Sequence, residues 1–176
     1  ITTGRKGDKF GINNLDETIE LAKYIRDSKN LEMVGLACHI GSQILNLKSY
    51  EMASKKTIDL ATKINKLGID LQFFDMGGGL GVPYLDESPP HPKELISMLE
   101  EVFVNRNEKL ILEPGRSISA NAGVLLTKVE YIKDNFAIVD AAMNDLIRPA
   151  LYGANMISGT LKIKLILWKS IISVSY

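Results

Sequence analysis

Short apolar segments alternate with longer amphipathic segments in the first part of the chain, and this alternation constrains the fold more than any other feature. Four apolar segments have the length of buried strands and span residues 9–12, 33–40, 71–76 and 109–112. Strands that alternate with helices pair in parallel through helical crossovers, so the pattern predicts an α/β layer or a (β/α) barrel. A closed eight-stranded barrel takes about 250 residues, and four strands amount to half of one.

The segments between these strands carry apolar side chains at helical spacing. They span residues 15–25, 50–67 and 95–102. Asn14 stands where the first helix would begin, and asparagine is a preferred residue at a helix N-cap. The pattern of apolar residues therefore predicts that strands and helices alternate strictly in this part of the chain.

The alternation stops after the fourth strand. Segments 123–130 and 136–140 predict strands of a different, antiparallel region. We therefore expect half of a (β/α) barrel over residues 1–116 and a transition into a β domain over residues 117–156. Residues 157–176 contain no Asp or Glu and mix Lys with apolar residues without a clear period, so they form an unassigned tail.

Charge and composition exclude several kinds of partner. The 21 basic and 21 acidic side chains cancel, which leaves no net field to hold nucleic acid or an anionic membrane. No apolar run reaches the roughly 18 residues that span a bilayer. The single cysteine, Cys38, cannot form an intramolecular disulfide and fits a reducing compartment. We expect a cytoplasmic protein with a small-molecule ligand.

Chemically distinctive residues directly follow three of the predicted strands. Residues 39–43 read His-Ile-Gly-Ser-Gln, residues 75–81 contain three consecutive glycines, and residues 113–116 read Glu-Pro-Gly-Arg. The carboxyl ends of parallel strands meet at one edge of a sheet or barrel, where ligands bind. These side chains are therefore expected to lie together.

The glycines at 77, 78 and 79 predict a turn that binds phosphate, because residues without Cβ let backbone N–H groups approach an anion closely. The motif is neither a P-loop nor the dinucleotide fingerprint, since no Lys-Ser/Thr follows and Val82 replaces the last glycine. A tight turn that needs positive φ explains the same residues without a ligand. Taken alone, the motif leaves both explanations open.

The other two motifs also have two explanations. Glu113 and Arg116 could each bind a charge on a ligand or form a structural salt bridge, and His39 could stack on a ligand or fill the core. No His/Cys/carboxylate cluster at ligand spacing predicts a metal site. Together, a histidine, a phosphate turn, a carboxylate and an arginine best fit pyridoxal phosphate. Glu113 would keep the ring nitrogen protonated, which makes the ring a stronger electron acceptor.

Four motifs resemble the diaminopimelate decarboxylase family in order and spacing: residues 39–43, 77–84, 113–123 and 144–153. The resemblance implies part of an alanine-racemase-type, TIM-like (β/α)8 barrel with the start of a C-terminal β domain. It also implies pyridoxal 5'-phosphate as cofactor and the conversion of meso-2,6-diaminopimelate to L-lysine and CO2, a step of lysine biosynthesis. A homodimer is implied for the complete enzyme.

The resemblance further implies roles for single residues. His39 would stack on the cofactor ring, Ser42 and the glycines would bind the phosphate, and Glu113 would face the pyridine nitrogen. Arg116 would serve the phosphate or the substrate. The implied cofactor-binding set is His39, Ser42, Gly77, Gly78, Gly79, Glu113, Gly115 and Arg116.

Arg148 and Tyr152 would bind the substrate by the same resemblance. A guanidinium can grip the distal carboxylate of diaminopimelate with two hydrogen bonds, whereas it would repel the cationic ends of ornithine and arginine. A structural ion pair beside a packed tyrosine explains the two residues without a ligand.

The chain departs from the family pattern in two places. The Schiff-base lysine would precede Ile1, and Lys9 lies on the wrong strand to replace it, so the catalytic residue stays unknown. Residues 157–176 do not resemble the family's continuation. We expect an internal segment that is inactive alone. Three alternatives are a non-catalytic pyridoxal-phosphate-binding protein of this fold, a related ornithine- or arginine-type decarboxylase, and an unrelated barrel enzyme acting on a sugar phosphate.

Overall fold

The computed structural model describes residues 10–12 and 14–153, which form two compact units. The first unit contains the described residues up to Val82 together with Ser88–Ser119. The second contains Pro83–Glu87 and the described residues from Ala120 onward. Among all the described residues of both units, no helix is long and apolar enough to cross a membrane.

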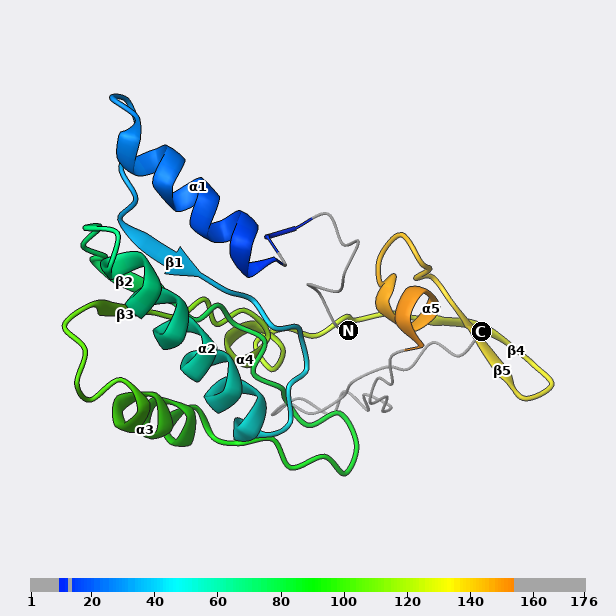
Figure 1. The fold of residues 1–176 in the computed structure, drawn as a ribbon. Helices are drawn as coiled ribbons and strands as arrows, with labels where there is room; N and C mark the ends of the chain where they lie inside the picture. Colours follow the sequence, from blue (N-terminus) through cyan, green and yellow to red (C-terminus); the bar gives the residue numbers. More distant parts are fainter. Residues whose placement is uncertain (1–9, 13, 154–176) are drawn as a thin grey trace. The chain divides into compact units, whose positions relative to one another are not determined.

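A three-stranded parallel sheet forms the centre of the first unit (Figure 1). Its strands are β1 (Gly35–Ala37), β2 (Phe73–Asp75) and β3 (Lys109–Ile111), and they lie side by side in that order. Each connection between them contains a helix, as parallel pairing requires. All three strands therefore end at the same edge of the sheet.

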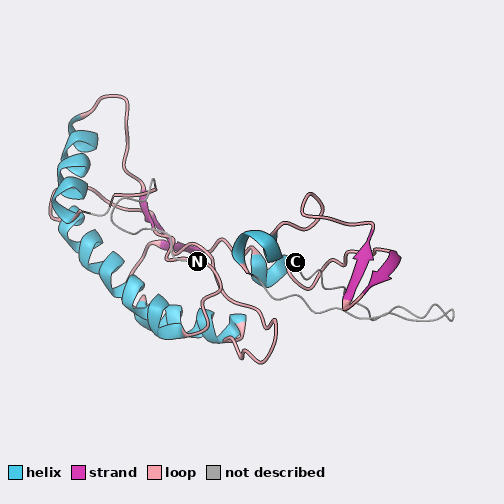
Figure 2. Cartoon of the chain, turned by 90° about the vertical axis from the view of Figure 1, so that its right-hand side faces the viewer, coloured by secondary structure: helices cyan, strands magenta, loops and turns pink. Residues whose placement is uncertain are grey.

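Three long helices lie side by side along one side of this sheet (Figure 2). They are α1 (Leu15–Asp27), α2 (Leu47–Asn65) and α3 (Pro92–Val102). Each begins at a side chain that accepts a hydrogen bond from a first-turn backbone N–H: Asn14, Asn46 and His91. The cap predicted at Asn14 is confirmed, with the N–H of Asp16 as donor at 2.9 Å.

The core of the first unit lies between the sheet and these helices. Phe74, in the middle of β2, is fully buried, and its ring centroid lies 5.4 Å from that of Phe103. Burial of such a side chain contributes about 1.5–3 kcal/mol to folding. The buried hydrophobic residues that the helices add are Ala22, Tyr50, Ala61, Ile64, Leu95 and Leu99.

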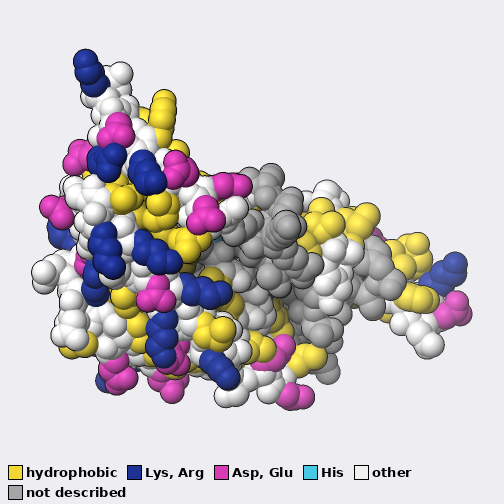
Figure 3. All heavy atoms as spheres, in the orientation of Figure 1, with side chains coloured by type: hydrophobic (Ala, Val, Ile, Leu, Met, Phe, Trp, Pro, Cys, Tyr) yellow, Lys and Arg dark blue, Asp and Glu magenta, His cyan; other side chains and the backbone are white. Residues whose placement is uncertain are grey.

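Basic and acidic side chains are mixed over the outer surface of the helices (Figure 3). The face in that view has no large area of a single charge. A field that attracts nucleic acid over a distance requires charge of one sign. This face therefore agrees with the balanced charge of the sequence.

The described part of the second unit contains a two-stranded antiparallel sheet and a short helix. Strand β4 (Val129–Lys133) pairs with β5 (Phe136–Val139), and Asp134 takes a positive φ of 50° in the turn between them. Helix α5 (Arg148–Tyr152) ends at Gly153, whose left-handed φ of 57° is typical of a helix C-terminus. All five residues of β4 are exposed.

The alternation of strands and helices is confirmed, although the parallel strands are shorter than predicted. The prediction of a strand over residues 9–12 is wrong for Phe10 to Ile12, which form no strand. Gly11 takes a φ of 75°, which interrupts an extended backbone, and Lys9 lies outside the described residues. The antiparallel pair is confirmed, but its first strand begins at Val129.

The predicted division of the chain at residues 116 and 156 stays a prediction. The tail from 157 to 176 lies outside the described residues.

Candidate functional site

The loops that follow β1, β2 and β3 meet at the carboxyl edge of the sheet. The N–H of Cys38 donates to the Asp75 carbonyl at 2.8 Å, and the N–H of Glu113 donates to the Gly77 carbonyl at 2.8 Å. Parallel pairing thus continues past the strand ends into the loops. The three predicted motifs lie together, as the alternation of strands and helices requires.

The glycines at 77, 78 and 79 pack directly against the backbone of the neighbouring loops. A Cβ atom at Gly78 would lie 2.0 Å from the Glu113 carbonyl oxygen, and one at Gly79 would lie 2.0 Å from the Gly41 carbonyl oxygen. Gly77 and Gly79 also have φ values of 66° and 95°, which L side chains rarely adopt. The turn explanation is therefore confirmed, and the phosphate role stays a prediction.

Tyr50 anchors the glycine turn from the interior of helix α2. Its side chain is buried, and its hydroxyl donates a hydrogen bond of 2.9 Å to the Gly78 carbonyl. Burial raises the pKa of Tyr50 to about 12, so the hydroxyl stays a hydrogen-bond donor in mildly alkaline solution as well as at neutral pH. The sequence pattern assigns Tyr50 only to an apolar helix face, because its polar partner lies 28 residues away.

Arg116 is the first residue of the short helix α4 (Arg116–Ser119), and its side chain reaches the loop after β1. One terminal nitrogen, Nη2, donates to the Ser42 hydroxyl at 2.9 Å. The other, Nη1, donates to the Gln43 side-chain oxygen at 3.3 Å. The structure thus brings together Ser42 and Arg116, two of the residues predicted to bind phosphate.

His39 and Glu113 lie at the same edge with exposed side chains. The Nδ1 atom of His39 lies 3.5 Å from the backbone nitrogen of Gly78, at the outer limit of a hydrogen bond. The alternative in which His39 fills the core is wrong, because its side chain is at the surface. Gly115, also exposed, lies in the turn between Glu113 and Arg116.

In the second unit, Arg148 contacts Tyr84. Its Nη1 donates to the Tyr84 hydroxyl at 2.9 Å, and its guanidinium carbon lies 5.1 Å from the centre of the Tyr84 ring. An arginine over an aromatic face gains a cation–π attraction in addition to the hydrogen bond. Tyr152, in the same short helix as Arg148, is exposed. The substrate roles of Arg148 and Tyr152 stay predictions.

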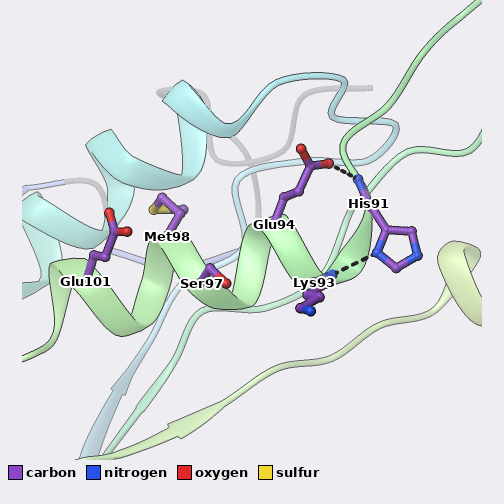
Figure 4. Close-up of a pocket in the computed structure, with 6 residues that line it drawn as sticks. All are labelled: His91, Lys93, Glu94, Ser97, Met98 and Glu101. Carbon is purple, nitrogen blue, oxygen red and sulfur yellow. Dashed lines mark hydrogen bonds between the residues drawn. The ribbon is translucent and has the colours of Figure 1, made fainter.

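A shallow hollow along α3 contains none of the predicted site residues (Figure 4). Its His91 accepts a hydrogen bond from the Lys93 N–H at 3.2 Å, and Glu94 accepts one from the His91 N–H at 2.6 Å. These bonds form a capping box at the start of the helix. The residues that line the hollow are His91, Lys93, Glu94, Ser97, Met98 and Glu101.

The residues at the sheet edge fit a phosphorylated aromatic ligand. The Ser42 hydroxyl and the Arg116 guanidinium are hydrogen-bond donors suited to phosphate. The glycines have no side chains that would keep an anion away from the backbone N–H groups of the turn. His39 offers a flat ring and Glu113 an exposed carboxylate. Within the described residues, no group of three or more His, Cys, Asp and Glu side chains is placed to hold a metal ion.

Fold and candidate site together indicate an α/β protein of the barrel type, with candidate ligand-binding residues at the strand ends, and comparison with known proteins gives the family. Residues 1–120 match the family model of the pyridoxal-dependent decarboxylase, pyridoxal binding domain. The chain therefore belongs to the pyridoxal-dependent decarboxylase family. Membership confirms the predicted fold class, part of an alanine-racemase-type barrel, and the predicted cofactor class.

Several relatives are diaminopimelate decarboxylases. Those of Haemophilus influenzae and Pseudomonas aeruginosa are 47% and 48% identical to this chain over 89% of its length. The crystal structure of diaminopimelate decarboxylase from Helicobacter pylori complexed with L-lysine matches with a TM-score of 0.86 and 41% identity, over 93% of this chain and 42% of that one. The chain spans 39% and 38% of the lengths of the first two relatives.

Gly78→Ala is predicted to force apart the ends of β2 and β3. The φ of Gly78 is not positive, so the effect is steric and comes from the Glu113 carbonyl. Forcing a methyl group into a packed site typically costs about 1–3 kcal/mol. Urea denaturation should show this loss in the free energy of unfolding.

Gly123→Ala is the matched control, because nothing lies within 4 Å of the Cβ it would add. We expect its free energy of unfolding to stay within about 0.5 kcal/mol of the unmodified protein. Equal stability of the two variants would contradict the close packing of the glycine turn.

Proposed function

We propose that the protein carrying this sequence is a pyridoxal-phosphate-dependent decarboxylase that converts meso-2,6-diaminopimelate to L-lysine and CO2. The observation that carries the proposal is the contact between Arg116 and Ser42 beside the glycine turn, at the edge where three parallel strands end. Family membership and 47–48% identity to diaminopimelate decarboxylases support the reaction and the substrate.

The cofactor would be held by groups from three different strand ends. The Ser42 hydroxyl and Arg116 guanidinium would bind its phosphate together with N–H groups of the glycine turn. His39 would contact the face of its ring. When bound, pyridoxal phosphate supplies an electron sink for the negative charge left on the substrate carbon as CO2 departs.

Glu113 would hold a proton at the ring nitrogen of the cofactor. Its backbone N–H donates a hydrogen bond to the Gly77 carbonyl, so the Glu113 side chain lies at the same edge as the groups proposed to bind phosphate. A carboxylate beside a pyridine nitrogen favours the protonated, cationic form of that nitrogen. The proposed role follows from this charge and this position.

Arg148 would bind the distal carboxylate of diaminopimelate, with Tyr152 as a further substrate contact. The hydrogen bond and ring contact with Tyr84 restrain the Arg148 guanidinium, and a restrained donor loses less conformational entropy when it binds. A cationic side chain at this position disfavours ornithine or arginine as substrate. This charge argument favours diaminopimelate over the alternative substrates.

The remaining assignments follow from the proposed reaction. The lysine that joins the cofactor is proposed to lie outside these 176 residues, so the segment would be inactive alone. We propose a homodimer for the complete enzyme and the cytoplasm as its location, which agrees with a single cysteine.

Glu113→Gln in the complete enzyme should lower kcat on the order of 10²-fold while cofactor occupancy persists. The amide keeps the shape of the side chain but cannot stabilise a protonated ring nitrogen. Turnover and the visible absorbance of the bound cofactor are measured on the same samples. Glu100→Gln, an exposed change on α3, is the control. Unchanged turnover of Glu113→Gln with normal absorbance would remove Glu113 from this role.

Arg148→Ala should cost roughly 2–5 kcal/mol of transition-state binding for diaminopimelate, the range for losing one partner of a buried charge pair. Cofactor absorbance should persist, and inhibition by cadaverine, which lacks the distal carboxylate that L-lysine retains, should change less. The measurements are kcat/KM and the inhibition constant of cadaverine. Arg26→Ala, an exposed change on α1, is the control. Equal weakening of both ligands by Arg148→Ala would instead indicate a structural role.

A further inference from the structure

The side chain of Gln43 binds the backbone of another strand-end loop. Its Nε2 donates to the Val82 carbonyl at 2.6 Å, and the Val82 N–H donates to its Oε1 at 3.2 Å. In a β ladder, backbone N–H and C=O groups of neighbouring strands form this same pattern of one donated and one accepted hydrogen bond. The Gln43 amide therefore acts as an additional peptide group that joins the loop after β1 to the loop after β2.

The backbone next to Gln43 makes the same connection. The Ile44 N–H donates to the Gly79 carbonyl at 2.9 Å, and the Gly81 N–H donates to the Ile44 carbonyl at 3.0 Å. Main chain and side chain thus form one continuous ladder of hydrogen bonds beside the glycine turn. The loop that contains Gln43 is therefore hydrogen-bonded to the last residue of that turn, Gly79.

The same amide oxygen also accepts the bond from Arg116. Oε1 of Gln43 lies 3.3 Å from Nη1 and Ser42 Oγ lies 2.9 Å from Nη2, so two consecutive residues contact both terminal nitrogens of the guanidinium. Because a guanidinium is planar and rigid, two contacts fix its orientation. The Gln43 amide therefore joins the Arg116 guanidinium to the backbone of Val82, which follows the glycine turn.

The backbone of Gln43 is in a strained conformation. Its φ is 60°, and among the described residues Asp134 is the other non-glycine residue with a positive φ. Asp134 lies in a hairpin turn, where this conformation is common, whereas Gln43 lies at the site. Such strain persists where surrounding contacts compensate for it. The three side-chain hydrogen bonds of Gln43 are such contacts.

We infer that Gln43 is a positioning residue that aims Arg116 at the anionic group of the ligand, and that a neutral amide is required for this role. A carboxylate at this position would pair with Arg116 and reduce the positive charge offered to the ligand. Its second oxygen would also face the Val82 carbonyl without a proton to donate. The identity of the anion, the phosphate of pyridoxal phosphate, rests on the proposed function.

Two substitutions separate this role from a purely structural one. Gln43→Glu keeps the size and adds charge, while Gln43→Met keeps the length and removes the hydrogen bonds without adding charge. A carboxylate at residue 43 keeps the hydrogen bonds from Arg116 and from the Val82 N–H, and these two bonds should outweigh its repulsion of the Val82 carbonyl. Met keeps neither bond, so stability should fall more in Gln43→Met. Affinity for an anion should fall more in Gln43→Glu. The two measurements are thus predicted to rank the variants in opposite orders.

The experiment measures the dissociation constants of inorganic phosphate and of pyridoxal phosphate for the full-length protein, with urea denaturation of the same samples. Gln43→Glu should weaken binding of both at least tenfold, and Gln43→Met should weaken it less. Gln72→Glu makes the same chemical change at an exposed position just before β2, and its affinities should stay within twofold of the unmodified protein.

Each outcome bears on one proposal. Phosphate affinity that falls in the same order as stability, or that is unchanged in Gln43→Glu, would overturn the positioning role even if the unmodified protein binds pyridoxal phosphate. Loss of inorganic phosphate binding in Gln43→Glu, combined with no pyridoxal phosphate binding by the unmodified protein, would support the positioning role and refute the cofactor assignment. If Gln43→Glu does not fold, unchanged phosphate affinity in Gln43→Met would overturn the role.

Discussion

The close approach of three backbone segments at the end of the parallel sheet is the constraint on which the proposed site depends. The glycine turn lies against the Gly41 and Glu113 carbonyls at distances that leave no room for a side chain. This contact places the loops after β1, β2 and β3 within hydrogen-bonding distance of one another. At this edge Ser42, in the loop after β1, and Arg116, at the start of α4, lie close enough to share a hydrogen bond.

The glycines therefore satisfy a structural requirement, and the same residues would serve the proposed phosphate site. Positive φ at Gly77 and Gly79 closes the turn, and the absence of Cβ atoms allows the loops to pack. The same absence lets an anion approach the backbone. A glycine turn in a strand-end loop is thus ambiguous in isolation, and its neighbours Ser42 and Arg116 make the case for a ligand.

Features that depend on local spacing could be predicted from the sequence. The alternation of strands and helices, the cap at Asn14 and the meeting of three motifs at one edge follow from periodicity and from parallel pairing. The prediction of a strand at Phe10 to Ile12 was wrong because apolar composition does not reveal the positive φ of Gly11. Local spacing therefore predicted that the three motifs meet at one sheet edge, but it did not predict the hydrogen bonds between them.

Features that depend on long-range partners could not be predicted. The hydroxyl of Tyr50 and the amide of Gln43 bind backbone groups 28 and 39 residues away, and no local pattern signals either contact. Tyr84 lay within a motif that resembled the family, but its pairing with Arg148 emerged only from the structure. Tyr50, Gln43 and Tyr84 hold other groups of the chain in place and are not themselves predicted to bind the ligand. Residue type alone therefore did not identify them.

We propose that the strand-end edge binds pyridoxal phosphate through its phosphate group. The most direct measurement compares the dissociation constants of pyridoxal phosphate and pyridoxal for the full-length protein, with inorganic phosphate as competitor. If the edge binds the phosphate group, pyridoxal phosphate should bind at least about 100-fold more tightly than pyridoxal, a difference of roughly 2.7 kcal/mol, and inorganic phosphate should displace it. Equal affinity for the two compounds, with no competition by phosphate, would contradict it.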